Sequence, residues 1–272
     1  MKNSWKEFQS EIDENLEDSK EKEMSLEDVK QSLLRELNDD EVSYGKELSD
    51  EVVEKNELSK ELVNKFPEYR ENAVKIAFER SPEEYVEFLE KNKEALSVNE
   101  SKREEGCYYF NNGVFMKKEM DDEEYAEVLR HEISHYLDDK KGWYSEQPEY
   151  LKAVYDDTLS FDFNDSSTTE YRDEMLDELF DSDVCYNRHV SDILSAVSGN
   201  NPEIILRYNM EGVPYYRHQN SYFDEGHNRE NEIYADVMAC ISENDAETIA
   251  FIKKYFPNIY EKTKESMKEG QV

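Results

Sequence analysis

Two histidines and a glutamate stand at the spacing of a metal-binding motif, in the run His131-Glu132-Ile133-Ser134-His135. The residues around this run have the periodicity of a helix, so the two imidazoles are expected one turn apart on one face, where both can reach a single metal ion. Glu132 then lies beside the metal as the general base for its bound water. We therefore expect a catalytic Zn²⁺ site with His131 and His135 as ligands.

A catalytic zinc site usually takes a third ligand from the protein, and the best candidate is Glu232 in the run N-E-I-Y-A-D at 231–236. Glu232 and Asp236 are four residues apart on an expected helix, so their carboxylates lie on one face. Glu232 is expected to bind the metal, and Asp236 to accept the free N–H of a ligating histidine, which fixes its tautomer. His227 and Glu230 are the alternatives for the third ligand.

Other side chains near these motifs could assist the chemistry. Asp138 falls on the helical face of the two histidines, where it either orients the site or meets solvent at a helix end. His218 and Tyr222 lie in the loop that leads to Glu232, and we expect them to donate hydrogen bonds to the oxyanion of an acyl transfer. The alternative for both is ordinary loop packing. His189 is interpreted as a plain helix residue.

An H-E-x-x-H run followed by a separate N-E-x-x-x-D run resembles the gluzincin class of zinc metallopeptidases, the class that includes thermolysin. The resemblance implies that His131, His135 and Glu232 bind zinc, that Glu132 is the base and that Asp236 supports a ligand. A narrower similarity, to zincin-like domains of phage minor head and other mobile-element proteins, covers roughly residues 105–245. It is carried by H-E-I-x-H-Y-x-D, by S-D-I-L-S-A-V at 191–197, by H-x-x-x-Y at 218–222 and by E-I-Y-A-D at 232–236.

The chain departs from that family pattern in two places. Arg130 precedes the first histidine, where an uncharged residue is commoner, and the gap between the two motifs is long.

Composition limits the classes of partner. The chain has 272 residues and a formal net charge of −34, so its surface repels phosphate and a nucleic-acid ligand is disfavoured. The three cysteines, Cys107, Cys185 and Cys240, form no paired framework, which indicates a reducing compartment. The chain shows neither a signal-peptide core nor a membrane-spanning run. We expect a cytoplasmic protein without a membrane partner, with association with a virion or delivery to a host cell left open.

The expected fold class is α+β, mostly helical, with a small sheet or hairpin. An acidic helical segment at 1–66, whose role is open, precedes a zincin-like metallopeptidase domain at 67–272 with its core at 105–256. The patterns predict helices at 68–97 with a Ser81 cap, a polar loop at 91–105 and a hairpin at 107–116 that turns at Asn112-Gly113. They also predict a helix that ends at 140–142 and one long helix at 171–197. Short strands are expected at 204–208 and 213–216, followed by a helix over 231–255 before Pro257 ends the fold.

Together these patterns predict a zinc-dependent endopeptidase that hydrolyses peptide bonds of a protein or peptide substrate. The hairpin at Tyr108–Met116 would pair with an extended substrate, and the acidic surroundings would favour a basic one. A non-catalytic acidic binding protein of phage or mobile-element origin, built on a zincin scaffold, is the alternative. A third interpretation, an acidic mimic of DNA, rests on net charge alone. The sequence does not predict an oligomeric state.

Overall fold

A computed structural model describes residues 58–101, 107–109, 113–159, 161 and 168–268. The helices expected before residue 58 and the turn residue Asn112 lie outside that part of the chain. The described elements form a mostly helical α+β fold. In chain order they are α3 (Lys60–Val63), η1 (Glu68–Arg70), α4 (Glu71–Phe78), α5 (Glu83–Asn92), η2 (Lys93–Ala95), β1 (Val98–Ser101), β2 (Cys107–Tyr109), β3 (Gly113–Lys117), α6 (Asp122–Lys140), η3 (Tyr144–Glu146), α7 (Pro148–Leu159), α8 (Thr169–Phe180), η5 (Asp183–Tyr186), α9 (Arg188–Ser198), α10 (Pro202–Glu211), α11 (Asn220–Phe223), α12 (Asn228–Glu243), α13 (Ala246–Tyr255) and α14 (Pro257–Lys268).

The sheet has three strands in the order β1-β3-β2. Strands β2 and β3 pair antiparallel, which confirms the two arms of the hairpin, but β1 pairs parallel with β3 in a stretch expected to be a loop. Gly113 permits this approach, because a Cβ built there would lie 2.5 Å from the carbonyl oxygen of Ser97. Strand β3 is therefore central, and β2 carries the open edge of the hairpin within the described part of the chain.

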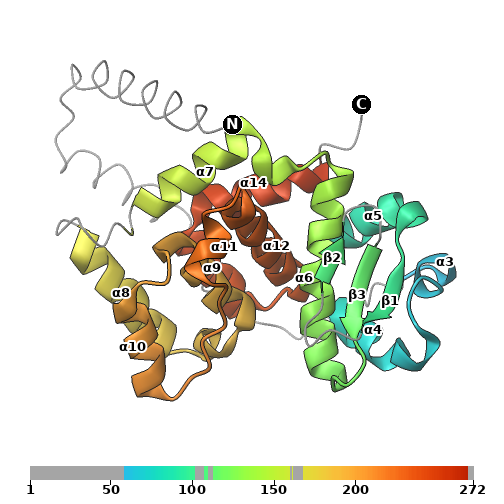
Figure 1. Ribbon diagram of the computed structural model, residues 1–272, viewed down its shortest axis with the longest axis horizontal. Helices are drawn as coiled ribbons and strands as arrows, with labels where there is room; N and C mark the ends of the chain where they lie inside the picture. The colour runs from blue at the N-terminus through green and yellow to red at the C-terminus, as the bar shows by residue number, and fades with distance from the viewer. Residues whose placement is uncertain (1–57, 102–106, 110–112, 160, 162–167, 269–272) are drawn as a thin grey trace, which may run out of the picture. The chain divides into compact units, whose positions relative to one another are not determined.

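Helix α6 lies between the sheet, with helices α3 to α5 on its side, and the helices that follow α6 in the chain (Figure 1). It packs against α4 and β3 on one side and against α12 on the other. Asp121 begins the helix by accepting a hydrogen bond from the backbone N–H of Glu124, and Gly142 follows its C-terminus with φ +70°. This position between two layers explains why α6 buries residues on most of its circumference.

Helices α6 and α12 run antiparallel and approach closely. Ala235 and Ala239 of α12 are fully buried, as expected for small residues at a helix contact. Arg130, unusual before a metal-binding histidine, is buried and its guanidinium lies 3.2 Å from Glu243 Oε1 at the other end of α12. Arg130, which departs from the pattern that the sequence resembles, therefore ties the two helices together.

Several predicted element boundaries are wrong, and local caps explain most of them. The single helix expected at 171–197 is three elements, α8, η5 and α9, because Asn187 caps a new helix by accepting from the N–H groups of His189 and Val190. Helix α10 occupies 202–211 where a strand was expected, and residues 213–216 form no strand. Asn244, with φ 56°, breaks the helix expected over 231–255.

Two predictions about Ser81 and Pro257 are also wrong. Pro82 rather than Ser81 occupies the N-cap of α5, and the Ser81 hydroxyl instead donates to the carbonyl of Ser242, at 2.7 Å. Pro257 starts α14 instead of ending the fold, since proline fits the first turn of a helix. Asp157 accepts a hydrogen bond from the N–H of Ile259 at 2.8 Å and holds this helix against α7.

The core runs through the whole described part of the chain. Leu62 and Phe66, which fall in the N-terminal segment by sequence, belong to the same core as the helices of the domain. None of the helices in the described ranges combines the length and the apolar composition needed to cross a lipid bilayer.

Candidate metal centre

Three side chains from α6 and α12, those of His131, His135 and Glu232, form a triad at the centre of the molecule. The Nε2 atoms of His131 and His135 lie 3.0 Å apart, and Glu232 Oε2 lies 3.2 Å from the first and 3.5 Å from the second. The two imidazole rings are nearly perpendicular, at 87°. The residues that the sequence predicts as metal ligands are thus brought together, although Glu232 is distant from the histidines along the chain.

These separations suit a small tetrahedral cation. Bonds of about 2.0–2.1 Å to nitrogen and oxygen in a tetrahedral zinc site place neighbouring ligand atoms about 3.3 Å apart. The three separations in the triad bracket that value. Two imidazole nitrogens and one carboxylate oxygen are also a donor set that catalytic zinc sites use. The residues present therefore fit zinc both in spacing and in chemistry.

The triad also has a surplus of electron-pair donors. The Glu232 carboxylate is buried and, among the described residues, its Oε2 atom has no hydrogen-bond partner. Burial by itself would raise the pKa of Glu232, but the nearby His135 and His131 hold it well below the usual range. Burial would likewise lower the pKa of His131, yet Asp236 and Glu232 raise it well above its usual value. The site therefore stabilises positive charge at the point where the three atoms meet.

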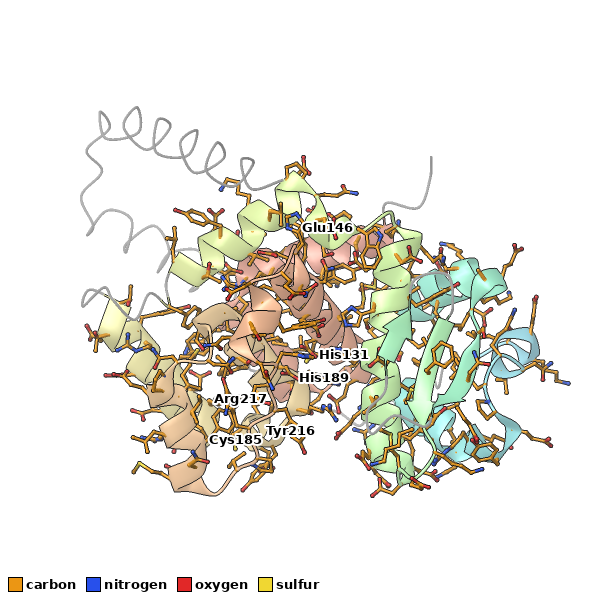
Figure 2. All side chains as sticks on the ribbon, in the orientation of Figure 1. His131, Glu146, Cys185, His189, Tyr216 and Arg217 are labelled. Atoms are coloured by element: carbon orange, nitrogen blue, oxygen red, sulfur yellow. The ribbon has the colours of Figure 1, made fainter. Side chains whose placement is uncertain are left out.

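Asp236 contacts two histidines, His131 of the triad and His189 of α9. Its Oδ1 atom lies 2.8 Å from His131 Nδ1 and 3.0 Å from His189 Nδ1. The two imidazole rings are almost parallel, with centroids 6.1 Å apart. Figure 2 labels the two neighbouring residues. Because Nδ1 of His131 donates to Asp236, its Nε2 atom is left as the electron-pair donor that a metal requires.

His189 is a site residue that the sequence prediction missed. It was interpreted as part of a long helix, whereas it lies in the first turn of α9, with 1% of its surface exposed. Asp192, one turn further on, is also buried, and burial raises its pKa to about 7. The S-D-I-L-S-A-V run contains Asp192 and is the signal that could have found it. Nothing in the local pattern pointed to His189.

His218 and Tyr222 both contact the third member of the triad. The Tyr222 hydroxyl donates to Glu232 Oε1 at 2.6 Å, and His218 Nε2 lies 3.3 Å from Glu232 Oε2. Their rings stack, with centroids 4.5 Å apart. Both residues precede α12, but only His218 lies in a loop, because Tyr222 belongs to the short helix α11; the segment expected to supply oxyanion donors does lie beside the triad. In this arrangement both polar groups are directed at Glu232.

Glu132 lies next to the triad in a setting that suits a base. It is 6% exposed, and burial raises the pKa of its carboxyl. His131, His135 and Arg188 act in the opposite direction, while Glu232 adds to the increase. A carboxylate with a raised pKa binds a proton more readily near neutral pH, which is the property that proton transfer from water demands.

The remaining candidates lie outside the triad. Asp138 is fully buried and accepts hydrogen bonds from the backbone N–H and the hydroxyl of Ser145, so it neither contacts a ligand nor meets solvent. The alternative third ligands, His227 and Glu230, contact each other at 3.8 Å and belong to neither of the metal-capable clusters among the described residues.

Comparisons of the chain with protein-family models, with curated proteins and with solved structures gave no match. The function must therefore be argued from the chemistry of the site.

Proposed function

We propose that this protein is a zinc-dependent peptidase of the zincin type. The observation that carries the proposal is the convergence of His131, His135 and Glu232 at the separations of a tetrahedral zinc site. The buried Glu132 beside them supplies a base, which a purely structural metal site does not need. Structural zinc sites usually take four protein ligands, whereas three leave a coordination position open.

Zinc in this triad would supply a Lewis acid that polarises a carbonyl and makes water more acidic. The roles of the protein's own residues follow from their surroundings. Glu132 accepts a proton from the attacking water and later delivers it to the leaving amine, because its carboxyl is buried and its pKa is raised. Asp236 keeps His131 in the tautomer whose Nε2 faces the triad.

His218 and Tyr222 are the donors closest to the reacting carbonyl in this proposal. The Tyr222 hydroxyl donates to Glu232 Oε1, and His218 Nε2 lies 3.3 Å from Glu232 Oε2. Once Glu232 shares its charge with a cation, either group can turn to the carbonyl oxygen, which becomes negative as water attacks. The open edge of β2 (Cys107–Tyr109), a neighbour of α6, offers backbone groups for an extended substrate.

The test is zinc content and proteolysis measured on the same purified full-length protein. We expect about one zinc ion per chain, lost on substitution of His131, His135 or Glu232 by Ala, because each removal leaves two protein ligands. The Glu132→Gln variant should keep its zinc and lose at least about a hundredfold in cleavage rate, the typical contribution of a general base.

Matched controls come from the residues outside the triad. His227→Ala and Glu230→Ala should leave zinc content and activity unchanged, since neither side chain reaches the triad. Zinc that persists in Glu232→Ala but not in Glu230→Ala would refute the assignment of the third ligand. A Glu132→Gln variant that retains the biological effect of the wild type would instead favour the non-catalytic binding protein.

A further inference from the structure

A polar pocket of about 480 Å³ opens beside the metal centre. It is bordered by the middle of α6, by η5 and the start of α9, and by the chain around the α12–α13 junction. Its walls hold five carboxylates and two guanidinium groups, and the residues that line it are Arg80, Glu127, Asp183, Val184, Tyr186, Asn187, Arg188, His189, Glu243, Asp245, Glu247 and Thr248.

The carboxylates of this pocket are not all used by the fold. Glu243 pairs with Arg130, and Asp245 accepts from the N–H of Thr248 to cap α13. Glu127, Asp183 and Glu247, by contrast, have no ion pair or side-chain hydrogen bond with any described residue.

Of the two guanidinium groups, that of Arg188 lies over the ring of Tyr216, at 4.8 Å from its centroid. The wall thus holds five carboxylates against the two guanidinium groups of Arg80 and Arg188, which leaves an excess of negative charge to receive a cation.

A buried acceptor in the wall points to the same kind of ligand. His189 is 1% exposed, and its Nε2 atom has no partner among the described residues. Since Nδ1 of this ring bonds to Asp236, Nε2 of the neutral ring is an acceptor. The carboxylates in the wall outnumber the two guanidinium groups, so the ligand that complements the pocket is a donor with positive charge.

The pocket is linked to the metal centre through residues that neighbour the triad. Glu127 lies one turn before His131 on the same face of α6. His189 lines the pocket and also bonds to Asp236, the residue that supports His131. A polypeptide bound at the triad would therefore have this pocket within reach of a neighbouring side chain.

We propose that the pocket receives a lysine or arginine side chain of the polypeptide that binds at the metal centre. The proposal rests on the peptidase function and adds a substrate class to it. An ammonium or guanidinium group would donate to the carboxylates of Glu127 and Asp183, while its aliphatic stem extends back to the cleavage site. A substrate with an acidic side chain at this position is repelled.

The experiment uses peptides that differ at one position, which carries lysine, norleucine or glutamate in turn. The variable residue is moved stepwise across the cleaved bond. Cleavage is measured with the zinc-loaded wild type, and binding is measured by fluorescence anisotropy with the zinc-loaded Glu132→Gln protein. At one position we expect lysine to be preferred over norleucine by about tenfold or more, the value of one charged hydrogen bond.

Pocket variants identify the source of the preference. The double variant Glu127→Gln, Asp183→Asn should reduce the lysine preference to about twofold, as expected when only weak surface attraction remains. The double variant Glu123→Gln, Glu124→Gln, which removes two negative charges from an exposed turn of α6 outside the pocket, should leave the preference intact.

The outcomes separate the two proposals. Equal binding of lysine and norleucine peptides, or a preference that survives in the double variant, would overturn the pocket assignment even if peptides are cleaved. A lysine preference in binding that depends on Glu127 and Asp183, without cleavage by the wild type, would support the pocket and refute the peptidase.

Discussion

Asp138 connects the helix of the H-E-x-x-H run to the helix that carries the third ligand. Its carboxylate accepts from the backbone N–H of Ser145 at 3.0 Å and from the Ser145 hydroxyl. The same hydroxyl lies 2.9 Å from Asn231 Oδ1, one residue before Glu232. A residue predicted to orient the site thus holds the two helices in register through Ser145, without touching the histidines.

The cost of burying this carboxylate predicts a pH dependence of stability. Burial raises the pKa of Asp138 to about 6 from its usual 3.8, although the Ser145 hydrogen bonds lower it in part. Because the folded-state pKa is the higher one, the proton stabilises the fold. That contribution is complete below the unfolded pKa and is lost as the pH rises through about 6. The loss amounts to about 3 kcal/mol in the free energy of unfolding.

Asp138→Asn imitates the protonated side chain and should remove this dependence. Urea unfolding of metal-free wild type and variant at pH 4 and at pH 7 measures it. The variant should gain stability relative to the wild type as the pH rises, and a constant difference between the two proteins would contradict the prediction.

At the level of elements, the cap of α9 decides where His189 lies. Asn187 accepts hydrogen bonds from the N–H groups of His189 and Val190, and its own amide donates to Glu243 Oε2 at 2.8 Å. The start of α9 is thereby fixed against the C-terminal end of α12. His189 reaches Asp236 only because the helix begins there.

Asn187→Ala should therefore lower two measured quantities. Loss of the cap costs about 1–2 kcal/mol in the free energy of unfolding. Displacement of His189 should weaken zinc binding by about tenfold, the usual effect of disturbing the partner of a metal ligand. Chemical denaturation and a competing chelator measure the two effects.

Asn201→Ala is the matched control, because Asn201 caps α10 through the N–H of Glu203 at 2.8 Å and contacts no residue of the triad. This variant should lose stability while keeping its zinc affinity. Serine at position 187, which restores the cap, should recover both quantities. Equal zinc affinity in the two alanine variants would show that the cap of α9 has no part in the metal centre.

The sequence predicted the elements whose signals are local. The periodicity around His131 and the i, i+4 pair of Glu232 and Asp236 predicted the two central helices and their shared face. Strand β1 was missed because three of its four residues are polar and its stability comes from pairing with β3, which lies further along the chain. The prediction that Pro257 ends the fold missed helix α14, which begins at this proline. The contribution of His189 depends on how α9 packs against α12, which no local pattern encodes.

At the scale of the whole molecule, the proposed metal joins the two halves of one core. The histidines belong to α6, which also packs against the sheet, and Glu232 belongs to α12, which packs against α9 and α14. Unfolding would separate these ligands, so a cation bound to all three binds the folded state almost alone.

Zinc removal should consequently lower the melting temperature. Ligand binding at a thousand times the dissociation constant stabilises the folded state by about 4 kcal/mol. Calorimetry of the wild type with saturating zinc and after chelation measures the shift. His135→Ala should melt at the same temperature in both conditions, and a wild type that does the same would rule out a tight site.

The antiparallel contact of α6 with α12 has a consequence for translation. The two histidines leave the ribosome well before Glu232, and an unfinished chain therefore carries an incomplete donor set. Under the proposed function, a nascent polypeptide can hydrolyse neither itself nor the polypeptides around it. Proteolytic activity would appear only after α12 has been synthesised and has packed against α6.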